Sequence, residues 1–438
     1  MNKIDKSIFA LTLPAVASNI TVPLLGFCDT AVSGHLGNES FLAAIATGSM
    51  MFNVIYLLCG FLRMATTGLT AEAYGRDSKR DVGLILARSM TIAFVMGLMA
   101  IFFQCPLERG LEWIINPHGD SQVLASEYFR ICVLGAPAFL LTMSINGWFI
   151  GMQNTLMTMI VSVSVNIVNI AGSLIFVFLF DQGFKGVALG TLCANWFGAI
   201  LSLVLLRYFV SRKKINVDFR QNPFKREGLR RFFSVSGDLV LRSVCILLVT
   251  LTVTSMGARM GERVLAINTV MMQFFLFFSY FMDGFAYAGE ALCGKWSGSG
   301  AKAKLRLTVR NLFKWAFLTA VIFTAFYVIG YSDIVSLITD VSDVKTGVFS
   351  MHSVVIAIPL ISAWAFILDG IFIGLAATRR MFITIFIATV AFMIIALSGF
   401  YFNSEYSNYY LWTAFLVYLF IRGIGLLVQL PVFLRKSN

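Results

Sequence analysis

The stretch Gly147-Trp148-Phe149-Ile150-Gly151-Met152 comes back later in the chain, at an offset of 223, as Gly370-Ile371-Phe372-Ile373-Gly374-Leu375. Pro137 precedes the first copy and Pro359 precedes the second, at an offset of 222. A repeat of this period in a chain of 438 residues indicates that one half of the protein duplicates the other. Many transporters consist of two related halves that rock against each other around a central site.

Two further matches support the duplication. Ala44-Ile45-Ala46-Thr47 resembles Ala266-Ile267-Asn268-Thr269 at an offset of 222, and residues 68–73 resemble residues 286–291 at an offset of 218. The four matches occur in the same order along both halves, which favours a duplicated half-protein over chance similarity between apolar segments.

The composition places the chain in a membrane. Hydrophobic residues make up 58% of it and charged residues only 13%, whereas a soluble domain has about 25% charged residues. Apolar runs of about 20 residues, long enough to cross a bilayer, recur along the whole length. We therefore expect an all-α polytopic membrane protein with twelve transmembrane helices. Their expected ranges are 8–33, 42–73, 83–104, 123–150, 155–180, 186–210, 231–257, 264–294, 308–330, 348–374, 381–402 and 408–434.

The halves should share one orientation in the membrane. Each holds six helices, an even number, so the second copy enters the membrane in the same direction as the first, and an axis along the membrane normal relates them. We expect an N-terminal lobe at 1–210, a basic linker at 211–230 and a C-terminal lobe at 231–438.

The charge distribution predicts the topology. The net charge of +12 comes largely from Lys and Arg in short loops between apolar segments, so it gives no reason to expect nucleic acid as a partner. The connection from Arg207 to Arg231 carries nine of them, and the other even-numbered connections are mostly basic too. Both termini and all even loops should therefore face the cytoplasm, with the chain in the inner membrane of the cell.

Asp29 is the most informative polar residue at membrane depth. Placing a charged side chain at the centre of a bilayer costs at least about 2.5 kcal/mol, so an ionisable residue there is expected to have a structural or functional role. Asp29 lies late in the first helix, six residues after Pro23, which removes one backbone hydrogen bond and favours a bend there. Two interpretations remain open: an acid at the outer end of the helix, or a protonatable coupling site facing a cavity, with Pro23 as its hinge.

A polar stripe follows on the fifth helix. Ser162, Asn166, Asn169 and Ser173 are spaced by 4, 3 and 4 residues and share one helix face. Such a stripe either joins helices to each other or lines the same cavity as Asp29.

The second half carries acids of its own. Asp369 is paired by the repeat with Asn146, which we also expect to line the cavity, and Asp283 lies on the eighth helix. Asp238 and Arg242 are four residues apart and are expected to neutralise each other. Glu72 and Glu290 are expected to anchor loops near the cytoplasmic ends.

The sequence shows no motif that is typical of an enzyme. The chain lacks a phosphate-binding GxxxxGK[ST] motif, and its seven cysteines and three histidines show no metal-ligand spacing. We expect no cofactor and no resident metal, so the energy for transport would have to come from an ion gradient.

The motifs that carry a family resemblance span almost the whole chain. They are Ser18 to Gly26 (SNITVPLLG), Asp29-Thr30-Ala31-Val32 with Gly34-His35-Leu36, Phe61 to Ala71, Asp283 to Ala288 (DGFAYA), and Leu368-Asp369-Gly370 with Phe372-Ile373-Gly374. Together they resemble the multidrug and toxic compound extrusion (MATE) family, in its bacterial DNA-damage-inducible (DinF-like) branch.

The resemblance implies two six-helix lobes with pseudo-twofold symmetry and a central cavity open to one side at a time. It implies export of hydrophobic, often cationic drugs in exchange for H⁺ or Na⁺. Asp29 matches the acid of the first helix, Pro23 its bend, and Asn169 an asparagine of the same polar site. Asp369, with Asp283, resembles a second cation site that some Na⁺-coupled members use.

One departure separates this chain from many relatives, which carry a second acid where Ser173 stands. With one acid left, H⁺ is favoured over Na⁺, which usually needs more oxygen charge. The alternative function is a flippase for a lipid-linked precursor. An anionic head group would call for several basic residues at membrane depth, and only Arg63 and Arg242 stand out there.

Overall fold

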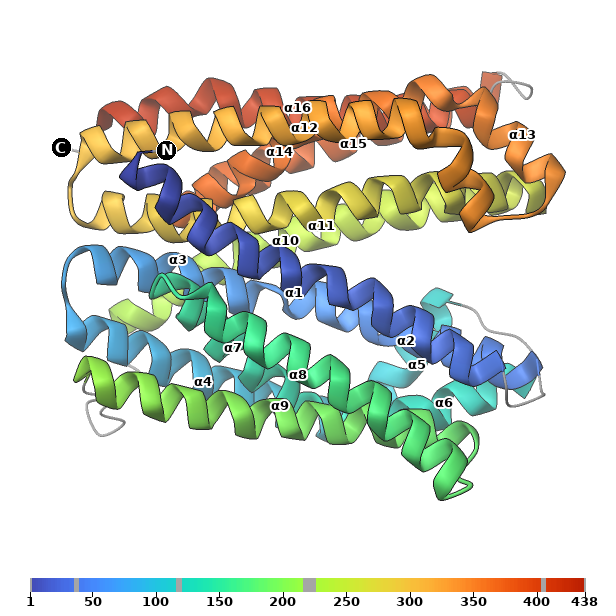
Figure 1. Ribbon diagram of the computed structural model, residues 1–438, viewed down its shortest axis with the longest axis horizontal. Coiled ribbons are helices and arrows are strands. Elements are labelled where there is room, and N and C mark those ends of the chain that lie inside the picture. Colours follow the sequence, from blue (N-terminus) through green and yellow to red (C-terminus); the bar gives the residue numbers. More distant parts are fainter. Residues whose placement is uncertain (1, 35–38, 116–119, 216–225, 403–406, 437–438) are drawn as a thin grey trace. The chain divides into compact units, whose positions relative to one another are not determined.

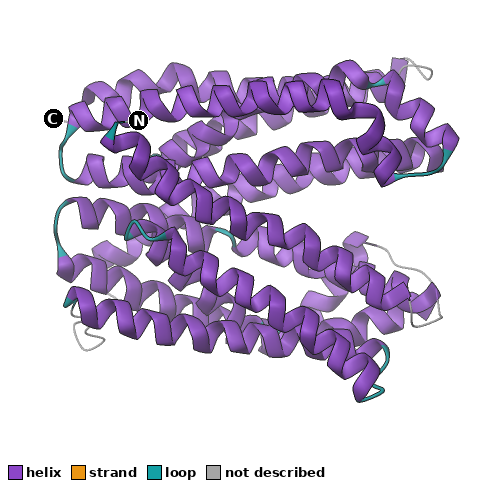
Figure 2. Cartoon of the chain, in the orientation of Figure 1, coloured by secondary structure: helices purple, strands orange, loops and turns teal. Residues whose placement is uncertain are grey.

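The computed structural model describes residues 2–34, 39–115, 120–215, 226–402 and 407–436, and within them every regular element is helical (Figure 2). Eleven stretches of these residues are long and apolar enough to span a bilayer, and a bent pair of helices makes a twelfth. The protein is thus a multi-pass α-helical membrane protein with the expected number of spans.

The chain divides into two compact units. We call Leu13–Ser236 the N-terminal unit, and Met1–Thr12 together with Gly237–Asn438 the C-terminal unit. The division falls inside two helices, so it differs from the expected boundaries at 210 and 231. The first turns of α1 (Lys3–Gly34) group with the C-terminal unit, and the first turns of α10 (Arg226–Arg259) group with the N-terminal unit.

Side-chain contacts explain the grouping of α1. Asp5 accepts hydrogen bonds at Oδ1 from Asn311 Nδ2 (2.9 Å) and Trp315 Nε1 (3.0 Å), and the ring of Phe9 packs edge-on against Trp315. Both partners lie on α12 of the C-terminal unit.

The N-terminal unit continues along the chain from α2 to α9 (Figure 1). These helices are α2 (Glu39–Cys59), α3 (Phe61–Gly75), α4 (Lys79–Phe102), α5 (Gln104–Ile115), α6 (Asp120–Val133), α7 (Ala136–Gly151), α8 (Thr155–Leu174), which ends in a π-helical turn (Ile175–Leu179), and α9 (Phe184–Lys213).

The C-terminal unit holds the rest of α10 and the helices that follow it. They are α11 (Glu262–Gly298), α12 (Lys302–Ile338), α13 (Ser342–Ser350), α14 (His352–Gly374), α15 (Thr378–Phe402) and α16 (Ser407–Lys436).

Two of the expected spans contain a local break. The span expected at 42–73 corresponds to the apolar stretch Ala44–Gly75, which is interrupted at Gly60, and the one expected at 123–150 bends by 56° between α6 and α7. Pro137 lies in the first turn of α7 and has no N–H to donate, so the α6 helix cannot continue through it. The segment Gln104–Ile115 was expected to be a connection but forms the amphipathic helix α5.

The backbone confirms the duplication. Asp77 and Gly300 have left-handed φ values (56° and 67°), as do Gln153 and Ala376 (63° and 52°), and each pair shows the same offset of 223. The turns around them share hydrogen bonds, since Asn154 N donates to Phe149 O and Ala377 N donates to Phe372 O. Both units therefore use the same turn after their equivalent helices.

The repeated glycines hold equivalent helices together. A Cβ added to Gly147 on α7 would collide with the backbone oxygen of Arg63 on α3, and one added to Gly370 on α14 would collide with that of Ala286 on α11. Arg63 and Ala286 are related by the same offset of 223. The expected match of 68–73 with 286–291, at an offset of 218, was therefore wrong in register.

Candidate functional site

The polar stripe of α8 lies partly in a buried network. Asn169 and Ser173 are 4% and 0% exposed. Asn169 Nδ2 donates to Thr191 Oγ1 of α9 (3.3 Å), and Ser173 Oγ donates to Asn169 Oδ1 (3.4 Å). The amide of Asn169 thus uses both its donor and its acceptor, which fixes its orientation between two helices.

The same stripe also holds α1. Asn166 Nδ2 donates to Thr21 Oγ1 (2.6 Å), and the Thr21 hydroxyl donates to the Ser18 carbonyl oxygen (2.7 Å). Thr21 lies two residues before Pro23, so this contact fixes α1 beside the proline. The sequence reasoning missed Thr21 and Thr191, because hydroxyls in apolar helices often bond only to their own helix.

Pro23 and Asp29 both lie in α1, which is helical from Lys3 to Gly34. Pro23 is exposed on the surface of the helix. The side chain of Asp29 lies outside the described residues, so its role as coupling group stays a prediction, as does the role of Pro23 as hinge.

Ser173 lies where α8 and α9 approach each other closely. A Cβ added to Gly190 of α9 would stand 2.5 Å from Ser173 N and 2.6 Å from Ser173 Oγ. The absence of a side chain at Gly190 gives the Ser173 side chain its space. The π-helical turn that follows packs in the same way, since a Cβ on Gly186 would stand 2.8 Å from Val177 N.

Asn146 lies on α7, and its backbone oxygen accepts a hydrogen bond from Thr158 Oγ1 of α8 (3.4 Å). Its side-chain Oδ1 is buried with no hydrogen-bond partner among the described residues. Asn146 therefore adds a buried polar acceptor next to the first turn of α8.

Asp369, the counterpart of Asn146 in the repeat, is held by two arginines. Arg242 Nη2 of α10 donates to Asp369 Oδ2 (2.7 Å), and Arg422 Nη2 of α16 donates to the same oxygen. The three side chains are all buried or nearly so, the most exposed being Arg242 at 11%. We call these residues the arginine triad; it joins three helices of the C-terminal unit through one carboxylate.

The triad corrects an expectation and adds a residue. Arg242 pairs with Asp369, whereas Asp238 accepts hydrogen bonds from Thr378 Oγ1 (2.9 Å) and Arg379 Nη1 (3.4 Å) at the start of α15. The expected intrahelical pair of Asp238 and Arg242 was therefore wrong. Arg422 was overlooked, although an arginine inside an apolar span is itself a signal of a buried polar contact.

Asp283 is half-buried on α11, and Glu290 on the same helix is 1% exposed. Both take part in polar contacts, and the hydrogen bonds to the Asp369 carboxylate come from Arg242 and Arg422. In the part of the chain that the structure describes, no three His, Cys, Asp or Glu side chains are arranged to hold a metal ion.

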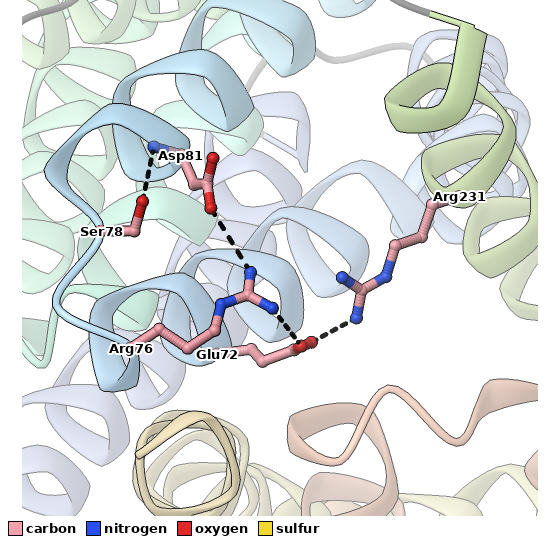
Figure 3. A network of polar contacts seen from close by, with 5 residues as sticks. All are labelled: Glu72, Arg76, Ser78, Asp81 and Arg231. Carbon is pink, nitrogen blue, oxygen red and sulfur yellow. Dashed lines mark hydrogen bonds and ion pairs between the residues drawn. The ribbon is translucent and has the colours of Figure 1, made fainter.

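Glu72 forms ion pairs at the far end of α3 from Gly60. Figure 3 shows its carboxylate between Arg76 (3.0 Å) and Arg231 of α10, while Arg76 also faces Asp81 (3.7 Å). Ser78 caps α4 by accepting a hydrogen bond from Asp81 N (3.3 Å). This cluster ties the first turns of α10 to the N-terminal unit, in agreement with an anchoring role for Glu72.

Comparisons with known proteins agree with this architecture. The MatE family model matches residues 14–175 and 239–397. DNA damage-inducible protein F of Escherichia coli (strain K12) is 30% identical over 425 residues, which cover 96% of this chain and 91% of that protein. A probable multidrug resistance protein NorM of Synechocystis is 24% identical, over 91% of this chain and 87% of that protein.

Solved structures show the same fold. A MATE transporter crystallised in the straight conformation superposes with a TM-score of 0.88 at 20% identity, covering 99% of this chain and 98% of that one. The bent conformation gives a TM-score of 0.86 at 18% identity, covering 100% and 97%. With the family model matching well over half of its length, the chain belongs to the MatE family of multidrug efflux transporters.

Proposed function

We propose that this protein is a proton-coupled antiporter that exports hydrophobic, often cationic drugs across the cytoplasmic membrane by alternating access. The observation that carries the proposal is the bond from Asn166 on α8 to Thr21 on α1, beside Pro23. It joins the polar face of α8 to the helix that carries Asp29. A movement of α1 would therefore change the contacts of that face.

The composition of that face favours protons as the coupling ion. Asn166, Asn169 and Ser173 are neutral, and Ser173 occupies the position of a second acid in many relatives. A carboxylate that acts without a second acid is suited to taking up and releasing one proton, because an apolar environment disfavours the charged form of a carboxylate. Na⁺ would gain little from amide and hydroxyl oxygens alone.

The arginine triad weakens the case for a sodium site in the C-terminal unit. Asp369 faces two guanidinium groups, so the triad carries more positive than negative charge and would repel a cation. In this arrangement we assign Asp369 a structural role, so that of the two acids expected to form a cation site there, Asp283 remains the candidate ligand.

The proposed cycle follows from these groups. Protonation of Asp29 from outside removes its charge, α1 repacks around a bend at Pro23, and the shrinking cavity releases the drug outward. Deprotonation on the cytoplasmic side resets the transporter. A flippase for a lipid-linked precursor is supported less well, because Arg242 and Arg422 are engaged by Asp369.

The test compares Asp29→Asn with Ser173→Ala in a strain that lacks its main exporters. Asp29→Asn mimics the protonated form permanently and should abolish resistance to a drug panel at equal membrane expression, while Ser173→Ala should be mild. In everted vesicles, drug addition should dissipate a pH gradient with the parent and not with Asp29→Asn. Equal export by Asp29→Asn would overturn the role of that residue.

A separate experiment decides the coupling ion. If transport in vesicles ran on a sodium gradient at fixed pH with an uncoupler present, proton coupling would be wrong, and Asp283 would become the preferred ligand. The topology is tested by cysteines placed in 212–231, which we expect to resist labelling from outside intact cells. Labelling there would contradict cytoplasmic termini.

A further inference from the structure

The N-terminal unit contains an apolar cavity of about 340 Å³ among α2, α4, α5, α6 and α7. Its walls include the buried side chains of Phe52 and Cys132 (6% and 2% exposed) and the stacked rings of Tyr56 and Phe139, whose centroids are 3.8 Å apart. The volume falls at the lower end of the range of about 300–1,000 Å³ for small-molecule sites.

The cavity opens where two helices are broken. Phe103 stands at the break between α4 and α5, and Val133 and Ala136 flank the 56° bend between α6 and α7. At the rim, the side chains of Met99 and Phe103 are 52% and 46% exposed. The cavity is therefore reached from the surface of membrane-spanning helices rather than sealed inside them.

The duplication shows that this space need not be open. Lys79 begins α4 and Lys302 begins α12 at the repeat offset of 223, and the same offset equates Ala100 in the cavity wall with Phe323. Phe323 is 8% exposed and packs against Phe281 (4.8 Å between ring centroids) and Phe278 (5.2 Å). The ring of Phe323 thus occupies, in the C-terminal unit, the place where the N-terminal unit carries only the methyl group of Ala100, while Phe278 and Phe281 correspond to Ile55 and Leu58 of the cavity wall. In addition, α12 runs unbroken to Ile338, whereas α4 ends at Phe102.

The lining decides the class of ligand. None of its fifteen side chains is charged, and its polar groups are the Tyr56 hydroxyl and the thiols of Cys59 and Cys132. A cationic drug would lose its hydration there without gaining a counter-charge. A hydrocarbon chain loses nothing, and the bilayer around these spans supplies such chains in great excess.

We propose that this cavity binds an acyl chain of a bilayer lipid. The chain enters past Met99 and Phe103 and fills the space that Phe323 and its neighbours fill in the other unit. The inference does not depend on the coupling ion or on the exported substrate, and its test measures lipid labelling rather than transport.

The experiment uses the full-length protein in vesicles of phosphatidylethanolamine doped with a phospholipid that carries a diazirine in mid-acyl chain. After irradiation, peptide mass spectrometry should find label on Phe52 and Cys132, which bilayer lipid at the outer surface does not reach. Ala100→Phe should lose that label and keep the label at Phe94, which is 46% exposed on the same helix. Phe323→Ala should gain label at Phe278.

Two results would overturn the proposal. One is label on Phe52 and Cys132 that Ala100→Phe leaves unchanged, or that is absent from the parent. The other is displacement of the lipid label by a cationic dye such as rhodamine 6G, which would make the cavity a drug site. Size-exclusion profiles verify folding, and Ala100→Leu, a smaller filler, replaces Ala100→Phe if the larger ring prevents it.

Discussion

The two units share a backbone plan and differ in what they bury. Their turns at Gln153 and Ala376 and their glycine contacts at Gly147 and Gly370 recur at a constant offset of 223. The same offset equates Asn169, in the buried network of α8, with Phe392 of α15, which is 0% exposed. Duplication has therefore kept the helix contacts, while the polar groups have been distributed anew.

The redistribution is clearest at the arginine triad. At the offset of 223, Asp369 corresponds to Asn146, Arg242 to Asn19 and Arg422 to Ala199, so none of the three charges has a charged counterpart in the N-terminal unit. Buried ions with fixed partners give a rigid unit, whereas neutral polar groups beside a single acid allow that acid to change its charge. We therefore expect the contacts around Asp369 to be more rigid than those around Asn146.

The largest expected effect comes from breaking the triad. Asp369→Asn leaves two buried guanidinium groups without a full counter-charge and should cost about 3–5 kcal/mol. The apparent unfolding temperature in detergent should fall strongly, while Asn146→Ala, at the matched position, should change it little. The double variant Asp369→Asn with Arg422→Gln should recover part of the loss. Equal sensitivity at Asp369 and Asn146 would contradict the expected difference between these two matched positions.

Next in size are the repeated glycines, where both units should respond alike. Gly147→Ala and Gly370→Ala each drive a methyl group into a neighbouring backbone oxygen and should cost about 1–3 kcal/mol. Thermal unfolding of both variants measures this, with Gly110→Ala as control because nothing lies within 4 Å of its added Cβ. Markedly different losses at the two glycines would show that the helix contacts are not equivalent.

The contact between α1 and α8 should be worth less. A double-mutant cycle with Asn166→Ala and Thr21→Val should give a coupling free energy of about 0.6 kcal/mol, the average for hydrogen bonds between membrane helices. Thr389, the counterpart of Asn166, donates to Ile385 O of its own helix (2.9 Å), and its side chain also contacts the Cys245 thiol of α10. Because a thiol is a weak hydrogen-bonding group, Thr389→Ala should lose less interhelical coupling than Asn166→Ala. A cycle that returns zero at Asn166 would remove the proposed link between α8 and α1.

The smallest expected effect is at the Glu72 cluster. Its partners Arg76 and Arg231 are 40% and 47% exposed, and exposed ion pairs contribute about 0–1 kcal/mol. Glu72→Gln should lower the unfolding temperature slightly at low salt and not at all at high salt, because salt screens such pairs. A loss that persists at high salt would indicate that the cluster is more than an electrostatic anchor.

Features of the fold and of the site could be predicted from the sequence when they depend on residues close together along the chain, and not when they depend on distant ones. The spans, the duplication and the shared face of Asn166, Asn169 and Ser173 follow from helical spacing and composition, which are local properties. The partners of Asp369 lie 127 and 53 residues away along the chain, and Thr378, which bonds Asp238, lies 140 residues away from it. No spacing rule connects such residues, so the nearest basic residue, Arg242, was assigned to the wrong acid.

The cavity was unpredictable for a related reason. It arises from the break at Phe103 and the bend beside Pro137, together with the small side chain of Ala100. Each of these features is common in a sequence of apolar residues. Only a comparison of the two folded units shows that Phe323 fills in one what remains open in the other.

The position of Asp5 has a consequence for the synthesis and assembly of the protein. Its hydrogen-bond partner Asn311 lies 306 residues further along the chain. At a synthesis rate of about 5–20 residues per second, about 15–60 s pass between the emergence of the two residues from the ribosome. During that time the start of α1 has none of its α12 partners, and its acidic group must stay hydrated at the edge of the membrane. The start of α1 can thus reach its final contacts only after α12 has been synthesised, so assembly of the C-terminal unit must wait for that helix.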